Sequence, residues 1–191
     1  GTIDWIAQTT PELASVERSI QRPVSGGANA VFVHGGQMDQ LFANDKLETV
    51  PDLIARIRDA GLPAGIAGHN PDVHRWAEDH VDVDFYMTCY YNPSNRARRA
   101  ERDAEARETY REQDRQAMVE LIGTLRRPAV HYKILAAGRN DPHEAFAFAA
   151  RHLRDNDAVC VGVHTKDNPD MVREDVDLLQ HALAEARSKA A

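Results

Sequence analysis

Short apolar runs alternate with helix-length segments along the whole 191-residue chain, and this alternation limits the folds open to it. Nearly continuous apolar runs are typical of strands that are buried on both faces of a parallel sheet. The segments between them space apolar residues three and four apart, as Leu53, Ile54 and Ile57 do, which indicates amphipathic helices. The sequence therefore predicts six β-α units, whose strands are the runs 3–7, 30–33, 64–67, 83–87, 129–135 and 158–163.

Proline marks the expected helix starts. Proline is tolerated at the first helical position because its missing N–H would have no partner there, and a polar residue before it can cap the helix. Repeated β-α units imply right-handed crossovers and a parallel α/β sheet. Six units suit an open doubly wound sheet, whereas a closed barrel of the TIM type needs eight. The capping pairs are Thr10-Pro11, Asn70-Pro71, Asp141-Pro142 and Asn168-Pro169.

Composition narrows the class of protein. A hydrophobic share of 42% is too high for a disordered chain, and a net charge of −7 argues against nucleic acids and anionic membranes as partners. Cys89 and Cys160 form no CxxC pair, which argues against a zinc ribbon or a disulfide scaffold. The chain shows no transmembrane run and no basic leader at its start. We therefore expect residues 1–191 to form a single soluble, cytoplasmic domain.

One segment breaks the alternation of runs and helices. Residues 93–115 are dense in arginine and acidic residues. We expect a charged helical extension after the fourth strand, with one solvated face. A lid or partner-binding loop over the strand ends is the alternative interpretation.

Polar and titratable residues follow the predicted strands. Because functional groups in parallel α/β folds gather at the carboxyl ends of the strands, these residues predict an active site there. No GxGxxG or phosphate-binding loop follows any strand, so nucleotide sites of those types lack support. The strand-end groups are Gln8-Thr9, His34-Gly35-Gly36, His69-Asn70, Cys89-Tyr90-Tyr91-Asn92, Lys133 with Gly138-Arg139, and His164-Thr165-Lys166-Asp167.

Five of these units, in chain order, resemble the aldo/keto reductases, which are (β/α)8 barrels. Residues 30–35 resemble that family's fourth strand, which ends in a catalytic histidine, and 65–71 resemble the fifth, which holds the nicotinamide carboxamide. Residues 83–93 are similar to the sixth strand and its exit, and 131–139 to the seventh. Residues 161–175 resemble the last strand and its phosphate-reading loop. The resemblance implies a TIM-type barrel represented by its last six units.

The same resemblance implies an NAD(P)H-dependent oxidoreductase that acts on a small carbonyl compound. His34 would polarise the substrate carbonyl, and NADP or NAD would be the cofactor. The sequence departs from the family where Gln8 or Thr9 replaces a catalytic lysine, His69 replaces a serine and Met171 replaces an adenosine-phosphate arginine. The residues that would surround the dinucleotide are His69, Asn70, Tyr132, Gly138, Arg139 and Lys166.

The resemblance also implies that the first two units of the barrel would lie upstream of residue 3. Six units alone leave two uncovered sheet edges, so we expect a homo-oligomer or a completing chain. An inactive barrel fragment that pairs with another chain is accordingly one alternative function.

A second alternative rests on Lys133, which the pattern places at a strand end. A lysine that is partly buried there suits Schiff-base chemistry in a lyase or isomerase of a small anionic carbonyl compound. A metal site is another alternative, because the strand ends of one barrel lie close together and His34, His69, Cys89 and His164 could converge there. These residues lack a local ligand spacing such as HExxH, so we expect no metal.

Each candidate also has a structural interpretation. His34 could bond to loop backbone, Asn70 could only cap a helix, Lys133 could pair with a carboxylate and Tyr132 could be a core aromatic. Arg139 and Lys166 could simply be solvated. Five further histidines fall on helical stretches and are interpreted as surface or interface residues: His74, His80, His143, His152 and His181.

Overall fold

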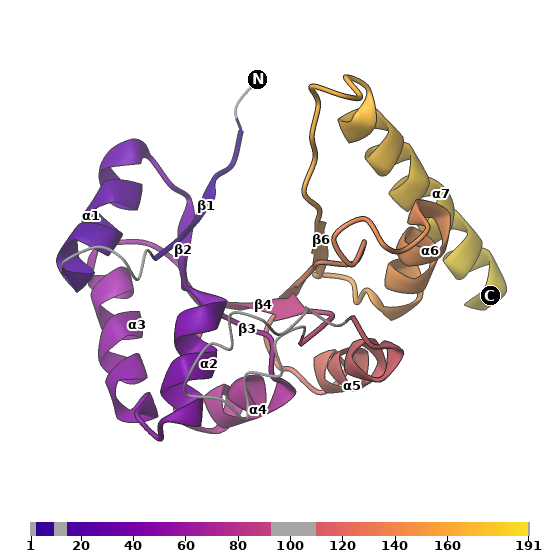
Figure 1. Ribbon diagram of the computed structural model, residues 1–191. Coiled ribbons are helices and arrows are strands. Elements are labelled where there is room, and N and C mark those ends of the chain that lie inside the picture. The colour runs from indigo at the N-terminus through magenta and orange to yellow at the C-terminus, as the bar shows by residue number, and fades with distance from the viewer. Residues whose placement is uncertain (1–2, 10–14, 93–109, 191) are drawn as a thin grey trace, which may run out of the picture.

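The computed structural model describes residues 3–9, 15–92 and 110–190, and its centre is a parallel sheet. Six strands pair in chain order, β1-β2-β3-β4-β5-β6, and the sheet curls as in a TIM barrel but stays open (Figure 1). In Figure 1 the two outer strands, β1 and β6, face each other across the open side. The strands are β1 (Ile6–Gln8), β2 (Ala30–Val33), β3 (Ala64–Gly68), β4 (Phe85–Cys89), β5 (Ala129–Tyr132) and β6 (Ala158–Cys160).

Helices cover the outside of this curled sheet (Figure 1). The predicted α/β fold with six β-α units of the TIM type is thereby confirmed. The helices are α1 (Val16–Gly26), α2 (Gly35–Ala43), a short 3₁₀ helix at Leu47–Thr49, α3 (Val50–Asp59), α4 (Pro71–His80), α5 (Glu112–Ile122), α6 (Pro142–His152) and α7 (Met171–Ala190). No helix in the described parts of the chain is both long and apolar enough to cross a membrane.

Element boundaries differ from the predicted ones in physically explicable ways. The strand predicted over 129–135 ends at Tyr132, because Lys133 adopts a left-handed φ of 59° that no strand can continue through. The last helix begins at Met171 and not at Pro169, because the side chain of Asn168 accepts the Asp170 N–H in a turn (3.1 Å). The expected helix start at residues 10–11 and most of the charged segment, 93–109, lie outside the described residues.

Strand alternation separates two layers of side chains. Phe32, Ala67 and Met87 pack together on the inner face of the sheet, with Val130 and Tyr132 beside them. The residues between them in each strand face the helices on the outer side and form the larger core, which includes Val31, Val33, Ile66 and Tyr86.

An apolar cavity of about 900 Å³ opens between the two edge strands. Trp5 and Ile6 line it from the β1 side, Val163 from the β6 side and Val172 from α7, and each of these side chains is at least two-fifths exposed. The inner-face residues Phe32, Met87 and Val130 also line it.

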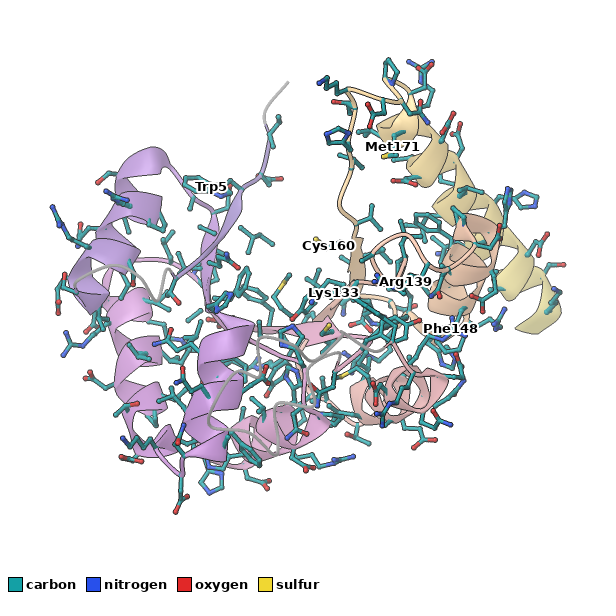
Figure 2. All side chains as sticks on the ribbon, in the orientation of Figure 1. Trp5, Lys133, Arg139, Phe148, Cys160 and Met171 are labelled. Atoms are coloured by element: carbon teal, nitrogen blue, oxygen red, sulfur yellow. The ribbon has the colours of Figure 1, made fainter. Side chains whose placement is uncertain are left out.

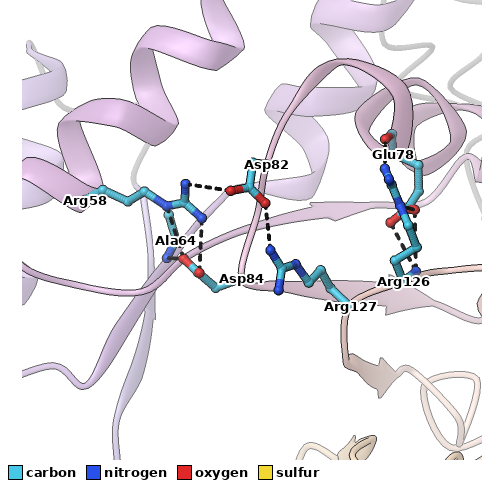
Figure 3. Close-up of polar contacts among 7 residues, drawn as sticks. All are labelled: Arg58, Ala64, Glu78, Asp82, Asp84, Arg126 and Arg127. Atoms are coloured by element: carbon cyan, nitrogen blue, oxygen red, sulfur yellow. Dashed lines mark hydrogen bonds and ion pairs between the residues drawn. The ribbon is translucent and has the colours of Figure 1, made fainter.

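Ion pairs hold together the amino ends of β3, β4 and β5 (Figure 3). Arg58 pairs with Asp84 (3.0 Å) and Asp82 (3.3 Å), and Asp82 also pairs with Arg127 (2.8 Å). Asp84 additionally accepts the N–H of Ala64, the first residue of β3, at 2.8 Å. Charges at this end of the sheet thus hold elements in place, which leaves the carboxyl ends of the strands for chemistry.

His74 is a correction to the sequence analysis, because it is a core residue and not a surface one. Its side chain is fully buried, with Nε2 3.4 Å from the Gly68 carbonyl oxygen and its ring edge-to-face with Tyr86. Burial lowers the pKa of His74 to about 4, so the folded protein holds this ring neutral.

We predict that His74 makes the fold acid-sensitive. Its pKa is lower in the folded state than in the unfolded chain, where it is about 6.5. The unfolded chain therefore binds the extra proton first, and stability falls as pH drops from about 6.5 towards about 4, by roughly 3 kcal/mol in total. Urea unfolding across this range should show the slope, and His74→Phe should flatten it. An equal slope in both proteins would contradict the assignment.

Candidate active site

The strand register brings predicted site residues to one level on the inner face. Cys89 pairs with Tyr132 across β4 and β5, and Gly68 pairs with Thr88 across β3 and β4. The residue after Gly68, His69, therefore lies at the level of Cys89 and Tyr132. The His69 and Tyr132 rings meet edge-to-face with centroids 6.0 Å apart.

Asp39, which the sequence analysis did not single out, holds His69 in place. It lies on α2 and is 2% exposed. Its Oδ2 is 2.7 Å from His69 Nδ1, and its Oδ1 accepts the backbone N–H groups of His69 (3.0 Å) and Asn70 (3.3 Å). Burial alone would raise the pKa of Asp39, but the hydrogen bonds from His69, the charge that its ring carries when protonated, and the Asn70 N–H hold the pKa below its usual range. An ionised Asp39 requires that Nδ1 of His69 carries the hydrogen.

Lys133 completes a chain of three side chains. Its Nζ lies 3.4 Å from Nε2 of His69, the nitrogen that Asp39 leaves as an acceptor. Among the described residues, no carboxylate pairs with Lys133, although a carboxylate partner was the structural interpretation of this residue. Lys133 is partly buried, as the sequence analysis expected. The order Asp39–His69–Lys133 thus runs from a buried helix to the end of β5.

The Cys89 thiol lies at the same level as His69 and Tyr132 but is a poor nucleophile. Its side chain is fully buried, and burial raises the pKa of the thiol to about 11 against the opposing charge of Lys133. Cys89 is therefore a neutral thiol at physiological pH.

The turn from β2 into α2 places His34 beside this layer. The His34 N–H donates to Thr9 Oγ1 (3.1 Å), which ties the turn to the end of β1. A Cβ on Gly35 would lie 3.2 Å from the Tyr132 hydroxyl and 3.3 Å from Ala67 Cβ, so glycine permits the close approach of α2 to β5.

Asn70 combines a structural role with an unmet donor. Its Oδ1 accepts the Asp72 N–H (3.1 Å) and caps α4 as predicted. Its Nδ2 is buried, and no hydrogen-bond partner for it occurs among the described residues. A buried donor of this kind costs about 1–3 kcal/mol unless a ligand or water accepts from it.

The residues predicted to bind phosphate do not lie with His69, Cys89 and Tyr132. Arg139 is exposed, and its guanidinium stacks over the Tyr110 ring at 4.5 Å and donates to the Ala136 carbonyl. Gly138 adopts a left-handed φ of 79° in the turn before it. Lys166 is exposed in the loop between β6 and α7. Figure 2 shows Met171, at the end of that loop, well apart from Lys133 and Arg139.

The alternative metal interpretation finds no geometric support within 3–9, 15–92 and 110–190. No three His, Cys, Asp or Glu side chains in those ranges are placed to hold one ion. His164, one of the four residues considered, is exposed and pairs instead with Asp167 (3.0 Å).

The signal that could have found Asp39 is a lone acidic residue in the stretch 38–42, where three of the other four residues, Met38, Leu41 and Phe42, are apolar. An acid that lies among apolar neighbours after a strand end is a candidate for burial with a partner. The sequence analysis did not predict a helix that starts directly after His34, so Asp39 had no place in a site.

The comparisons with known proteins concern the fold alone. One solved structure, of a protein assigned to the aldo-keto reductases from Pseudomonas aeruginosa, matches with a TM-score of 0.60 and 18% identity over 93% of this chain and 66% of that one. A second structure, of another assigned aldo-keto reductase from this organism, matches with a TM-score of 0.53 and 20% identity. The match covers 88% of this chain and 58% of that one. The chain thus spans less than two thirds of their length. No family model and no curated protein matches the sequence.

We predict that the two cysteines differ sharply in reactivity. Cys160 is exposed, although partial burial of its thiol raises the pKa of that group, whereas Cys89 is fully buried and burial raises the pKa of its thiol to about 11. At pH 8 iodoacetamide should modify Cys160 at least about tenfold faster than Cys89, because a thiol reacts as its thiolate. Peptide mass spectrometry measures both rates, and Cys89 should react readily once guanidinium unfolds the chain. Equal rates in the folded protein would show that the inner layer at Cys89 is open to solvent.

Proposed function

We propose that this chain is an aldo/keto reductase-like oxidoreductase that uses NAD(P)H to reduce a small carbonyl compound. The single observation that supports it most is the buried, unmet Nδ2 donor of Asn70 at the end of β3. The likeness in fold to two assigned aldo-keto reductases agrees with this proposal.

The residues at the carboxyl ends of the strands fit the nicotinamide end of such a cofactor. Asn70 Nδ2 would donate to the carboxamide oxygen, with His69 beside it, and the Tyr132 ring would pack against the nicotinamide. When bound, NAD(P)H supplies the hydride. Arg139 and the N–H groups near Gly138 would contact phosphate, and Lys166 would offer a point charge to the adenosine end.

His34 would act on the substrate. It precedes α2, whose first N–H groups carry a partial positive charge, so an oxygen near this ring meets a favourable potential. A hydrogen bond from the imidazole to the carbonyl oxygen would stabilise the negative charge that develops there during reduction.

We predict that NADPH or NADH binds and that the Asn70 amide contributes. Asn70→Ser keeps a capping oxygen but removes the Nδ2 donor, so it should weaken binding about tenfold, as loss of one hydrogen bond does. Titration with quenching of tryptophan emission measures the dissociation constant.

The chain offers a matched control. Asn44 is an exposed asparagine at the end of α2, away from the carboxyl ends of the strands, and its Nδ2 donates to the Gln40 carbonyl at 2.7 Å. Asn44→Ser removes the same amide donor and should leave cofactor affinity unchanged. A flat titration with the folded wild-type protein, for both cofactors, would overturn the proposed function.

A further inference from the structure

Lys133 is a strand-end group that the proposed reductase leaves unused. We propose that Lys133 is an amine nucleophile that captures a small aldehyde or ketone as an imine, with His69 as its base and Asp39 as the residue that positions His69. The inference is independent of the proposed cofactor, because it rests on the contact between Lys133 and His69.

The backbone turns Lys133 towards the inner face. In β5, Val130 and Tyr132 lie with the inner cluster, while His131 is buried on the other face near Tyr90. If Lys133 continued the strand, its side chain would point to the same outer face as that of His131, because side chains alternate between the two faces of a strand. The left-handed φ of 59° at Lys133 breaks this alternation, and its Nζ reaches His69 on the inner side. For a residue with a Cβ this conformation is unfavourable by about 1 kcal/mol or more, so the surrounding contacts must hold it.

The partner of Lys133 is a base and not a counter-ion. A lysine must lose a proton before its nitrogen can attack a carbonyl carbon. A carboxylate beside Nζ would hold the ammonium form, whereas the Nε2 lone pair of His69 can take the proton. Asp39, 2.7 Å from Nδ1, stabilises the imidazolium that results. This arrangement repeats the order acid, imidazole and nucleophile of covalent catalysis in general.

The capture step balances without an oxidant or a reductant. His69 takes a proton from the Lys133 ammonium; the amine lone pair then forms a C–N bond to the carbonyl carbon, and the C=O π pair moves to oxygen. His69 returns its proton to that oxygen and takes one from nitrogen, which gives a neutral carbinolamine. A last proton transfer from His69 to the hydroxyl lets water leave, and a protonated imine remains. The sum is ammonium plus carbonyl compound to protonated imine plus water.

Cys89, which lies at the same level, does not compete for the carbonyl carbon. It is buried and stays protonated at neutral pH. The amine of Lys133 is therefore the nucleophile available at the ends of β4 and β5.

Reductive trapping tests this proposal on the full chain. The protein is incubated with glycolaldehyde, and in a parallel sample with pyruvate, together with sodium cyanoborohydride and no nicotinamide cofactor; peptide mass spectrometry then measures adducts at each lysine. The three other lysines, Lys46, Lys166 and Lys189, are exposed and serve as internal controls. We expect Lys133 to be modified at least tenfold faster than each of them with one of the two probes. Modification of Lys133 no faster than the exposed lysines, with both probes, would overturn the proposal.

Two variants test the proposed roles of His69 and Asp39. Asp39→Asn and His69→Gln should each lower the rate at Lys133 at least tenfold, while circular dichroism and urea unfolding stay as in the wild-type protein, which excludes a general loss of structure. Asp82→Asn, an exposed carboxylate at the opposite end of the strands, is the control and should change no rate. A folded His69→Gln protein that traps at the wild-type rate would show that His69 is not the base. Cofactor binding without trapping would overturn only the Lys133 proposal, and trapping without cofactor binding only the reductase.

Discussion

The buried carboxylate of Asp39 is the interaction on which the candidate site depends. Within the described parts of the chain it accepts three N–H donors, the His69 ring and the backbone of His69 and Asn70, and so joins α2 to the end of β3. Burying a charge without such partners would cost several kcal/mol, so removal of any donor weakens the whole arrangement. Through this one group the turn after β2 and the turn after β3 hold a fixed relative position, and the His69 ring has one orientation.

The fold could be predicted from the sequence because the same pattern, an apolar run followed by an amphipathic segment, occurs six times. Six apolar runs in a row leave few alternatives to a parallel sheet, and the Asn70-Pro71 and Asp141-Pro142 pairs cap helices as expected. Boundaries were less accurate where a single residue decides them. The φ of 59° that ends β5 at Lys133 has no marker in the sequence, since glycine would be the usual residue there.

The site could be predicted only in part, and the reason is geometric. The rule that functional groups follow parallel strands selected His34, His69 and Lys133, and the family resemblance added Tyr132. The structure brings His69 into contact with both Tyr132 and Lys133. The rule could not supply Asp39, which lies within a helix and is buried by packing that the sequence does not show. Nor could it place Arg139, whose stacking on Tyr110 depends on a contact between distant segments. The roles assigned to these residues stay predictions.

The central claim is that His69 is held between Asp39 and Lys133 in one protonation state, and nitrogen NMR tests it most directly. Long-range ¹H–¹⁵N spectra of the histidine-labelled protein at pH 7, with His69→Gln to assign the signal, report which ring nitrogen carries hydrogen. We expect a neutral His69 with hydrogen on Nδ1 and none on Nε2, and a loss of this preference in Asp39→Asn. Hydrogen on Nε2 in the wild-type protein, or the same tautomer in Asp39→Asn as in the wild-type protein, would contradict the proposed role of Asp39.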